Sequence, residues 1–121
     1  MVQSYEELHV YKRSYKGAVV MIQMSKGLPF EERYELASQI KRASASIPLN
    51  IAEGYGKGAN GAELKRFLMM ARGSANEMKV LLSLCRDLEY IEPAEVGRYI
   101  RSYDEIGKML TGLIRSVKLK A

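Results

Sequence analysis

The sequence of 121 residues is 47% hydrophobic and 27% charged, which is typical of one folded domain and excludes a disordered chain. One cysteine excludes an internal disulfide, and one histidine leaves too few soft ligands for a zinc site. The formal charge of +5, with an isoelectric point near 9.4, favours an acidic partner, most simply nucleic acid.

The first expected helix begins at a capping-box pattern formed by Ser4 and Glu7 and ends at Lys26 and Gly27. Its expected core face consists of apolar residues at helical spacing, namely Leu8, Tyr11, Tyr15, Ala18, Val19 and Ile22.

A second helix is expected to begin near Glu31 and Glu32, whose charges suit a first turn, and to end at the glycines at 54, 56 and 58. Its core face is predicted to be Leu36, Ile40, Ala43, Ile47 and Ile51.

Asn60 and Glu63 repeat the capping pattern before a third helix of about 28 residues. Its expected core face is Leu64, Phe67, Leu68, Ala71, Ala75, Met78, Leu81, Leu82 and Cys85. Pro93 suits the first position of a fourth helix, and Ile91 and Val96 have the spacing of a hydrophobic staple. The fourth core face is predicted to be Val96, Ile100, Tyr103, Leu110, Ile114 and Val117.

These patterns predict an all-α protein, with residues 1–121 forming a single antiparallel up-down four-helix bundle. No segment alternates with period two, so no sheet is expected. No apolar run approaches the roughly 20 residues that span a bilayer, and the first residues lack the apolar core of a signal peptide. We therefore expect a cytoplasmic protein without a membrane partner.

A second apolar seam is expected on two helices, on the side away from the core residues. It consists of Val10, Ser14, Gly17, Met21 and Met24 on the first helix and of Met69, Gly73, Asn76, Val80 and Leu84 on the third. Because a helix in an isolated bundle needs one buried stripe, two such seams indicate that subunits pack side by side. The alternative is that these are scattered surface residues, which monomeric proteins tolerate.

Basic residues form a ridge along the third helix, where Lys65, Arg72, Lys79 and Arg86 recur every seven residues. Only Arg86 has an acidic residue, Glu89, three or four positions away. The first helix adds His9, Lys12, Arg13 and Lys16. A similar row on the fourth helix, Arg101, Lys108 and Arg115, is typical of an ordinary solvated face because Asp104 and Glu105 lie nearby. The ridge predicts nucleic-acid binding through phosphates, and the alternative is that its charges are solvated or paired across helices.

The stretch from Ser46 to Gly58 combines a proline, a polar stripe and three glycines. The glycine spacing is not that of a dinucleotide or phosphate loop, and the stretch follows a helix where those loops follow a strand. Pro48 should bend the helix and free the carbonyl of Ser44, while Asn50 is placed to satisfy freed backbone groups and Glu53 to pair with a base such as Lys57. We interpret Ser46, Pro48, Asn50, Glu53 and Gly54 as a structural motif, with a ligand pocket as the alternative.

Signals for catalysis and cofactor binding are lacking in the sequence. A di-metal bundle needs inward Glu-x-x-His pairs, which do not occur, and adjacent acids do not converge on one helical face. Cys85 lies on the core stripe and is interpreted as a small buried hydrophobe. We expect neither an enzyme nor a protein that binds a metal or cofactor.

The segments "SIPLNIAEG" (46–54), "KRFLMMARGSANEM" (65–78) and "IGKMLTGLIRSVK" (106–118) resemble the bacterial four-helix-bundle family of large-subunit (23S) rRNA intervening-sequence proteins. The resemblance covers nearly the whole chain and implies an up-down bundle that assembles into a ring-like homopentamer. The family is also similar to the accessory variability determinant of diversity-generating retroelements, a basic pentameric bundle that binds a reverse transcriptase and nucleic acid.

Two functional hypotheses follow from these observations. The first is a non-enzymatic, oligomeric nucleic-acid-binding bundle, with RNA preferred over DNA, that uses Lys65, Arg72, Lys79 and Arg86 together with Lys12, Arg13 and Lys16. The second is a protein-interaction module that acts as a partner of a reverse transcriptase. In the second hypothesis the basic surface is secondary.

Overall fold

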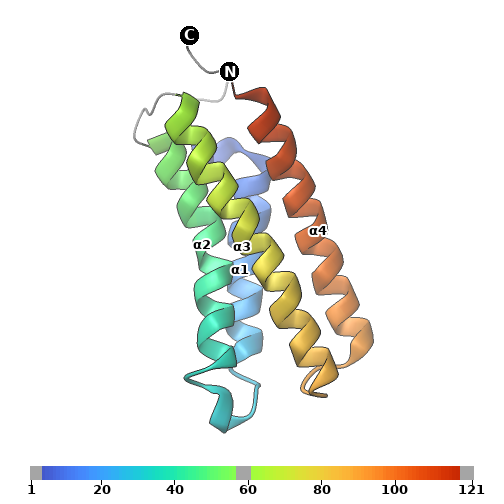
Figure 1. Ribbon diagram of the computed structural model, residues 1–121. Coiled ribbons are helices and arrows are strands. Elements are labelled where there is room, and N and C mark those ends of the chain that lie inside the picture. Colours follow the sequence, from blue (N-terminus) through green and yellow to red (C-terminus); the bar gives the residue numbers. More distant parts are fainter. Residues whose placement is uncertain (1–3, 57–60, 118–121) are drawn as a thin grey trace.

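The computed structural model describes residues 4–56 and 61–117, which contain four α-helices, two short 3-10 helices and no strand (Figure 1). The elements are η1 (Tyr5–Glu7), α1 (His9–Ser25), η2 (Phe30–Glu32), α2 (Leu36–Gly56), α3 (Gly61–Asp87) and α4 (Pro93–Ser116). The predicted all-α, four-helix fold class is therefore confirmed. No helix within these residues is both long and apolar enough to cross a membrane.

Two predicted helix starts differ from the structure. The Ser4 hydroxyl accepts a hydrogen bond from the Glu6 amide at 3.1 Å, so it caps η1 and not the long helix. Leu8, whose backbone is extended, separates η1 from α1. Glu31 lies in η2, and α2 begins only at Leu36 because a further turn intervenes. The predicted end of α1 before Lys26 and the start of α4 at Pro93 are confirmed. Asn60 and Gly58 lie outside the described residues.

The helices pack in chain order around the core. α2 lies between α1 and α3, α3 packs on α4, and α4 has a smaller contact with α1. Within the described residues α1 and α3 do not meet, so they occupy opposite corners of the bundle. The α1–α2 and α3–α4 connections both lie at the lower end in Figure 1.

The predicted core faces of α2, α3 and α4 are largely confirmed. All five apolar residues predicted for α2 are buried, as are all those predicted for α3 except the half-buried Leu64. On α4, Ile106 joins the buried set, while Ile100 and Val117 are only partly buried. The apolar residues repeat every three to four positions, so each of these helices has one apolar face that packs into the core.

The predicted core face of α1 is only partly confirmed: Ala18 is buried and Leu8 and Tyr11 pack against the core, but most of the buried residues come from the other apolar stripe. Val10 and Met21, expected on an outer seam, are 2% and 1% exposed, whereas Tyr15 and Val19 are 56% and 43% exposed. The buried stripe carries small residues that allow close packing, and the hydroxyl of the buried Ser14 donates to a backbone carbonyl at 3.1 Å. A tyrosine on that stripe would need its own buried partner.

The remaining seam residues of α1 also face the interior. Gly17 lies against Tyr103 of α4, because a Cβ at position 17 would be 3.2 Å from the Tyr103 hydroxyl. Met24 is half-buried and packs against the core. The interpretation of Val10, Gly17, Met21 and Met24 as a contact between subunits is therefore corrected: these residues hold α1 in its own bundle.

The polar motif of α2 makes hydrogen bonds within the bundle. The Ser46 Oγ lies 2.7 Å from the Ala43 carbonyl and 2.6 Å from the Ser74 Oγ, so Ser46 donates to the carbonyl and accepts from Ser74 of α3. The Asn50 amide donates to the Ser46 carbonyl at 2.8 Å, not to the carbonyl that Pro48 frees. The helix continues through Pro48 as far as Gly56. The proposed partner of Glu53, Lys57, lies outside the described residues.

Gly54 shows why α2 and α3 approach closely at this end. A Cβ at position 54 would lie 2.9 Å from Leu64 Cδ1 and 3.1 Å from Phe67 Cβ, closer than such atoms pack. Glycine thus allows the close approach of α2 and α3 here, and a larger residue would displace Leu64 and Phe67.

Candidate functional site

The centre of the predicted basic ridge faces α4. The Arg72 guanidinium donates to the Thr111 hydroxyl at 3.4 Å, and the Lys79 ammonium pairs with the Asp104 carboxylate at 2.8 Å. Both contacts join α3 to α4, so Arg72 and Lys79 lie on the flank of α3 that faces α4.

A groove of about 510 Å³ follows this flank between α3 and α4. Its charged lining residues are four cations and one carboxylate, namely Arg72, Lys79, Lys108, Arg115 and Asp104. Gly107 and Gly112 also line the groove, and the absence of side chains there leaves room between the cations. The groove therefore carries three net positive charges along two packed helices.

The charges in the groove are not equivalent. Lys79 is neutralised by Asp104, and this hydrogen-bonded pair, with a smaller contribution from Lys108, lowers the pKa of the Asp104 carboxyl. Arg72, Lys108 and Arg115 have no ion-pair partner among residues 4–56 and 61–117. These three cations are available to an anionic ligand, and the Thr111 hydroxyl adds a neutral donor beside them.

The ends of the predicted ridge do not join the groove. Arg86 pairs with Asp87 at 2.9 Å, and not with Glu89 as its spacing suggested. Lys65, at the other end of α3, lines a separate shallow depression with Arg66 and Met69. The four ridge residues are evenly spaced in the sequence, but only Arg72 and Lys79 line the groove.

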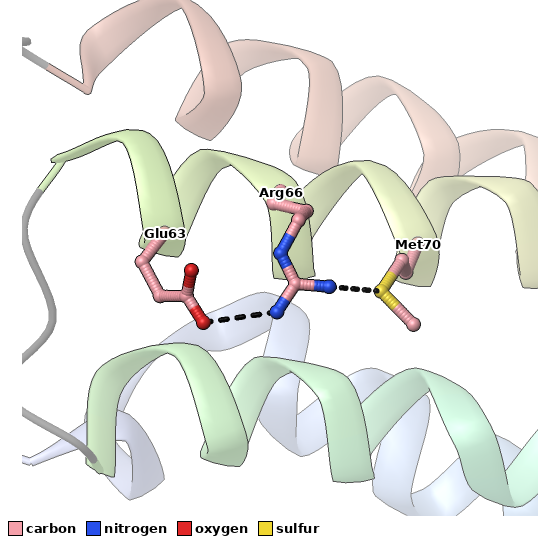
Figure 2. Close-up of polar contacts among 3 residues, drawn as sticks. All are labelled: Glu63, Arg66 and Met70. Carbon is pink, nitrogen blue, oxygen red and sulfur yellow. Dashed lines mark hydrogen bonds and ion pairs between the residues drawn. The ribbon is translucent and has the colours of Figure 1, made fainter.

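Arg66 is a cation of α3 that does not line this groove (Figure 2). Its guanidinium donates to the Glu63 carboxylate at 2.9 Å and to the Met70 sulfur at 3.7 Å. In Figure 2 these three side chains point to the side of α3 nearer α2, away from α4. Arg66 is therefore a natural control for Arg72, since it has the same charge on the same helix with a carboxylate beside it.

The basic residues of α1 form a different surface. Lys12 and Lys16 are exposed, and the Arg13 guanidinium lies 3.8 Å from the Glu105 carboxylate of α4. Arg13 lines a depression of about 500 Å³ with Arg98 and Arg101. Because α1 and α3 occupy opposite corners, the basic residues of α1 lie on a different surface from those of α3.

Lys108, Arg115 and Thr111 were missed as site residues by sequence reasoning. Lys108 and Arg115 share the seven-residue spacing of the α3 ridge, which is the one signal that could have placed them beside it. The nearby Asp104 made this row look neutral, but in the structure Asp104 pairs with Lys79 across the helices.

The outer face of α3 carries the second predicted seam. Met69, Val80 and Leu84 are 49%, 62% and 44% exposed, and a Cβ at Gly73 would meet no atom within 4 Å. The part of the seam on α3 is thus an exposed apolar face, in contrast to the part on α1.

Cys85 has the properties of a packed residue. Its side chain is inaccessible, and burial, with a smaller contribution from Glu32, raises the pKa of the thiol to about 11. Such a thiol stays protonated at neutral pH. In the part of the chain that the structure describes, no three His, Cys, Asp or Glu side chains are grouped so as to hold a metal ion.

Comparison with known proteins places the chain beside one family and a solved structure. The model of the family described as "23S rRNA-intervening sequence protein" matches residues 6–112. A crystal structure of a protein of unknown function from the S23 ribosomal protein family of Bacteroides thetaiotaomicron is similar, with a TM-score of 0.81 and 29% sequence identity. That match covers 88% of this chain and 96% of the other. No curated protein matches the chain. Because the family model spans most of the sequence, the chain belongs to the 23S rRNA-intervening sequence protein family.

Proposed function

We propose that the protein is a non-enzymatic RNA-binding bundle that holds RNA phosphates in the groove between α3 and α4. The observation that carries this proposal is the set of three cations, Arg72, Lys108 and Arg115, that line one groove and form no ion pair within the described part of the chain, Lys108 having only a weaker interaction with Asp104. The arginines suit bidentate contacts to phosphate oxygens, and Lys108 contributes a point charge. The family description, which refers to 23S rRNA, favours RNA over DNA.

This mode of binding follows the nucleic-acid backbone and does not read bases. Besides its cations, the groove is lined by Asp104, Asn76, Thr111 and two glycines, and it lacks an aromatic residue on which a base would stack. We therefore expect low sequence selectivity and strong dependence on salt, because each neutralised phosphate releases counterions.

We further propose that the antiparallel bundle assembles as a homopentamer. The apolar face of α3 (Met69, Gly73, Val80 and Leu84) and the exposed Tyr15 and Val19 of α1 lie on helices at opposite corners. Contact between two different faces of neighbouring copies is heterologous and generates a ring when the rotation closes. A ring repeats the groove on every subunit, so several weak phosphate contacts act together. A monomer in light scattering at micromolar concentration would refute this assembly.

The test of RNA binding compares Arg72→Gln with Arg66→Gln. Both variants lose one positive charge from α3, so a general effect of net charge is the same in both. For single-stranded RNA, the logarithm of affinity falls against the logarithm of salt with a slope of about −0.7 per neutralised phosphate. Filter-binding titrations at several salt concentrations should show a shallower slope by about 0.7 and weaker binding for Arg72→Gln only.

The outcome also separates the alternative function. A protein-interaction module, such as a reverse-transcriptase partner, would use the exposed apolar face of α3 and not the groove. If wild-type binding does not respond to salt, or both variants lose the same affinity, the groove is not the RNA site. If the Arg72→Gln and Arg66→Gln variants then still co-purify with a reverse transcriptase, that result would support the protein-interaction function.

A further inference from the structure

A second basic pocket lies where α1 ends and α2 begins. It has a volume of about 330 Å³, and its charged lining residues are Lys26, Arg33 and Lys41. The connection that carries it is at the lower end of the bundle in Figure 1. The pocket shares no lining residue with the groove between α3 and α4.

The acidic residues of the same segment are directed elsewhere. Glu32 accepts a hydrogen bond from the Tyr90 hydroxyl at 2.7 Å, which holds its carboxylate toward the α3–α4 connection. Glu31 and Glu35 are exposed and do not line the pocket. Among the residues that the structure describes, Lys26, Arg33 and Lys41 have no ion-pair partner. The pocket therefore brings three positive charges together, although the segment that forms it also contains acidic residues.

Aromatic rings accompany these charges. The Arg33 guanidinium carbon lies 3.6 Å from the centre of the Phe30 ring and 4.4 Å from that of Tyr34. Its Nη1 also donates to the Phe30 carbonyl at 3.2 Å, which fixes the guanidinium between the rings. Phe30 and Tyr34 are nonetheless 73% and 76% exposed. Large aromatic rings held this far out of the core offer flat faces to a ligand.

We propose that this pocket binds a nucleotide unit, with its phosphate against Lys26, Arg33 and Lys41 and its base stacked on Phe30. Cations without carboxylate partners supply charge-assisted hydrogen bonds to phosphate oxygens, and an exposed ring accepts the face of any base. The volume lies at the lower end of the range for small-molecule sites, which suits one nucleotide. A free mononucleotide and the terminal nucleotide of a single strand share this chemistry.

Calorimetric titration of the full-length protein with AMP, adenosine and inorganic phosphate tests the proposal. AMP should bind more tightly than either of its parts. Lys41→Gln should weaken AMP binding about tenfold, the loss of one charge-assisted contact. Phe30→Ala should weaken AMP binding but leave phosphate binding unchanged. The matched control is Arg42→Gln, because Arg42 is the exposed neighbour of Lys41 and does not line the pocket.

The proposal is overturned if AMP does not bind, or if Lys41→Gln and Arg42→Gln reduce its affinity equally. The salt dependence of binding to a 5′-hydroxyl RNA should respond to Arg72→Gln and not to Lys41→Gln, so this proposal and that of the groove between α3 and α4 can fail separately. A 5′-phosphorylated oligoribonucleotide compared with its 5′-hydroxyl form identifies the source of the nucleotide. Tighter binding of the phosphorylated form indicates a strand end, and equal affinity with retained AMP binding indicates a free nucleotide.

Discussion

Replacement of Tyr103 by phenylalanine should stabilise the protein. The Tyr103 side chain is 2% exposed, and its hydroxyl is the one buried side-chain polar atom without a hydrogen-bond partner in residues 4–56 and 61–117. The same burial raises the pKa of Tyr103. An unpaired buried hydroxyl costs about 1–3 kcal/mol. A gain of about 1 kcal/mol, at about 2.1 cal/mol/K for each of 121 residues, raises Tm by about 4 °C.

Gly17 of α1 provides a second variant that tests the same contact. A Cβ at position 17 would lie 3.2 Å from the Tyr103 hydroxyl oxygen and 3.7 Å from the ring carbon that carries it. Alanine in place of glycine inside a helix gains about 1 kcal/mol. In wild type the tight contact should offset that gain. In the Tyr103→Phe background the closer atom is gone, so Gly17→Ala should add its full effect.

Urea denaturation of wild type, both single variants and the double variant measures these free energies of unfolding and their coupling. All four proteins must be compared at one concentration, because assembly makes stability depend on it. A loss of stability in Tyr103→Phe would show that the hydroxyl has a partner. Equal effects of Gly17→Ala in both backgrounds would show that the close approach of α1 and α4 is absent.

Two further predictions concern packing and pH. Gly54→Ala should lower the free energy of unfolding by about 1–3 kcal/mol, since its Cβ would lie 2.9 Å from Leu64 Cδ1. At Gly107 of α4 an added Cβ would meet no atom within 4 Å, so Gly107→Ala should instead add about 1 kcal/mol. A similar effect of Gly54→Ala and Gly107→Ala in urea denaturation would contradict the packing argument. Lys79→Gln should raise the lowered pKa of the Asp104 carboxyl toward 3.8, seen as a shifted NMR titration. In wild type the pair stabilises the fold above pH 3.8 and loses this effect as pH falls through the lowered pKa, so an unchanged titration would show that the pair does not form.

The existence of four helices and the core faces of three could be predicted from the sequence. In α2 one apolar stripe recurs without a rival. In α3 the core stripe has more large apolar residues than the second seam, which includes Gly73 and Asn76, so the core stripe is the one that is buried. Pro93 and Lys26-Gly27 marked helix ends because proline and glycine constrain the backbone locally. These features depend on residues a few positions apart, and the sequence alone contains them.

The orientation of α1 and the composition of the groove between α3 and α4 were decided by tertiary packing. α1 has two apolar stripes, and the one with small residues was buried because it lets Tyr103 approach Gly17. Likewise the spacing of Arg72 and Lys79 was visible, but the pairing of Lys79 with Asp104 depends on how α3 lies against α4. Sequence periodicity determines which residues share a helical face. Which face meets which neighbour depends on the fit between helices distant in sequence.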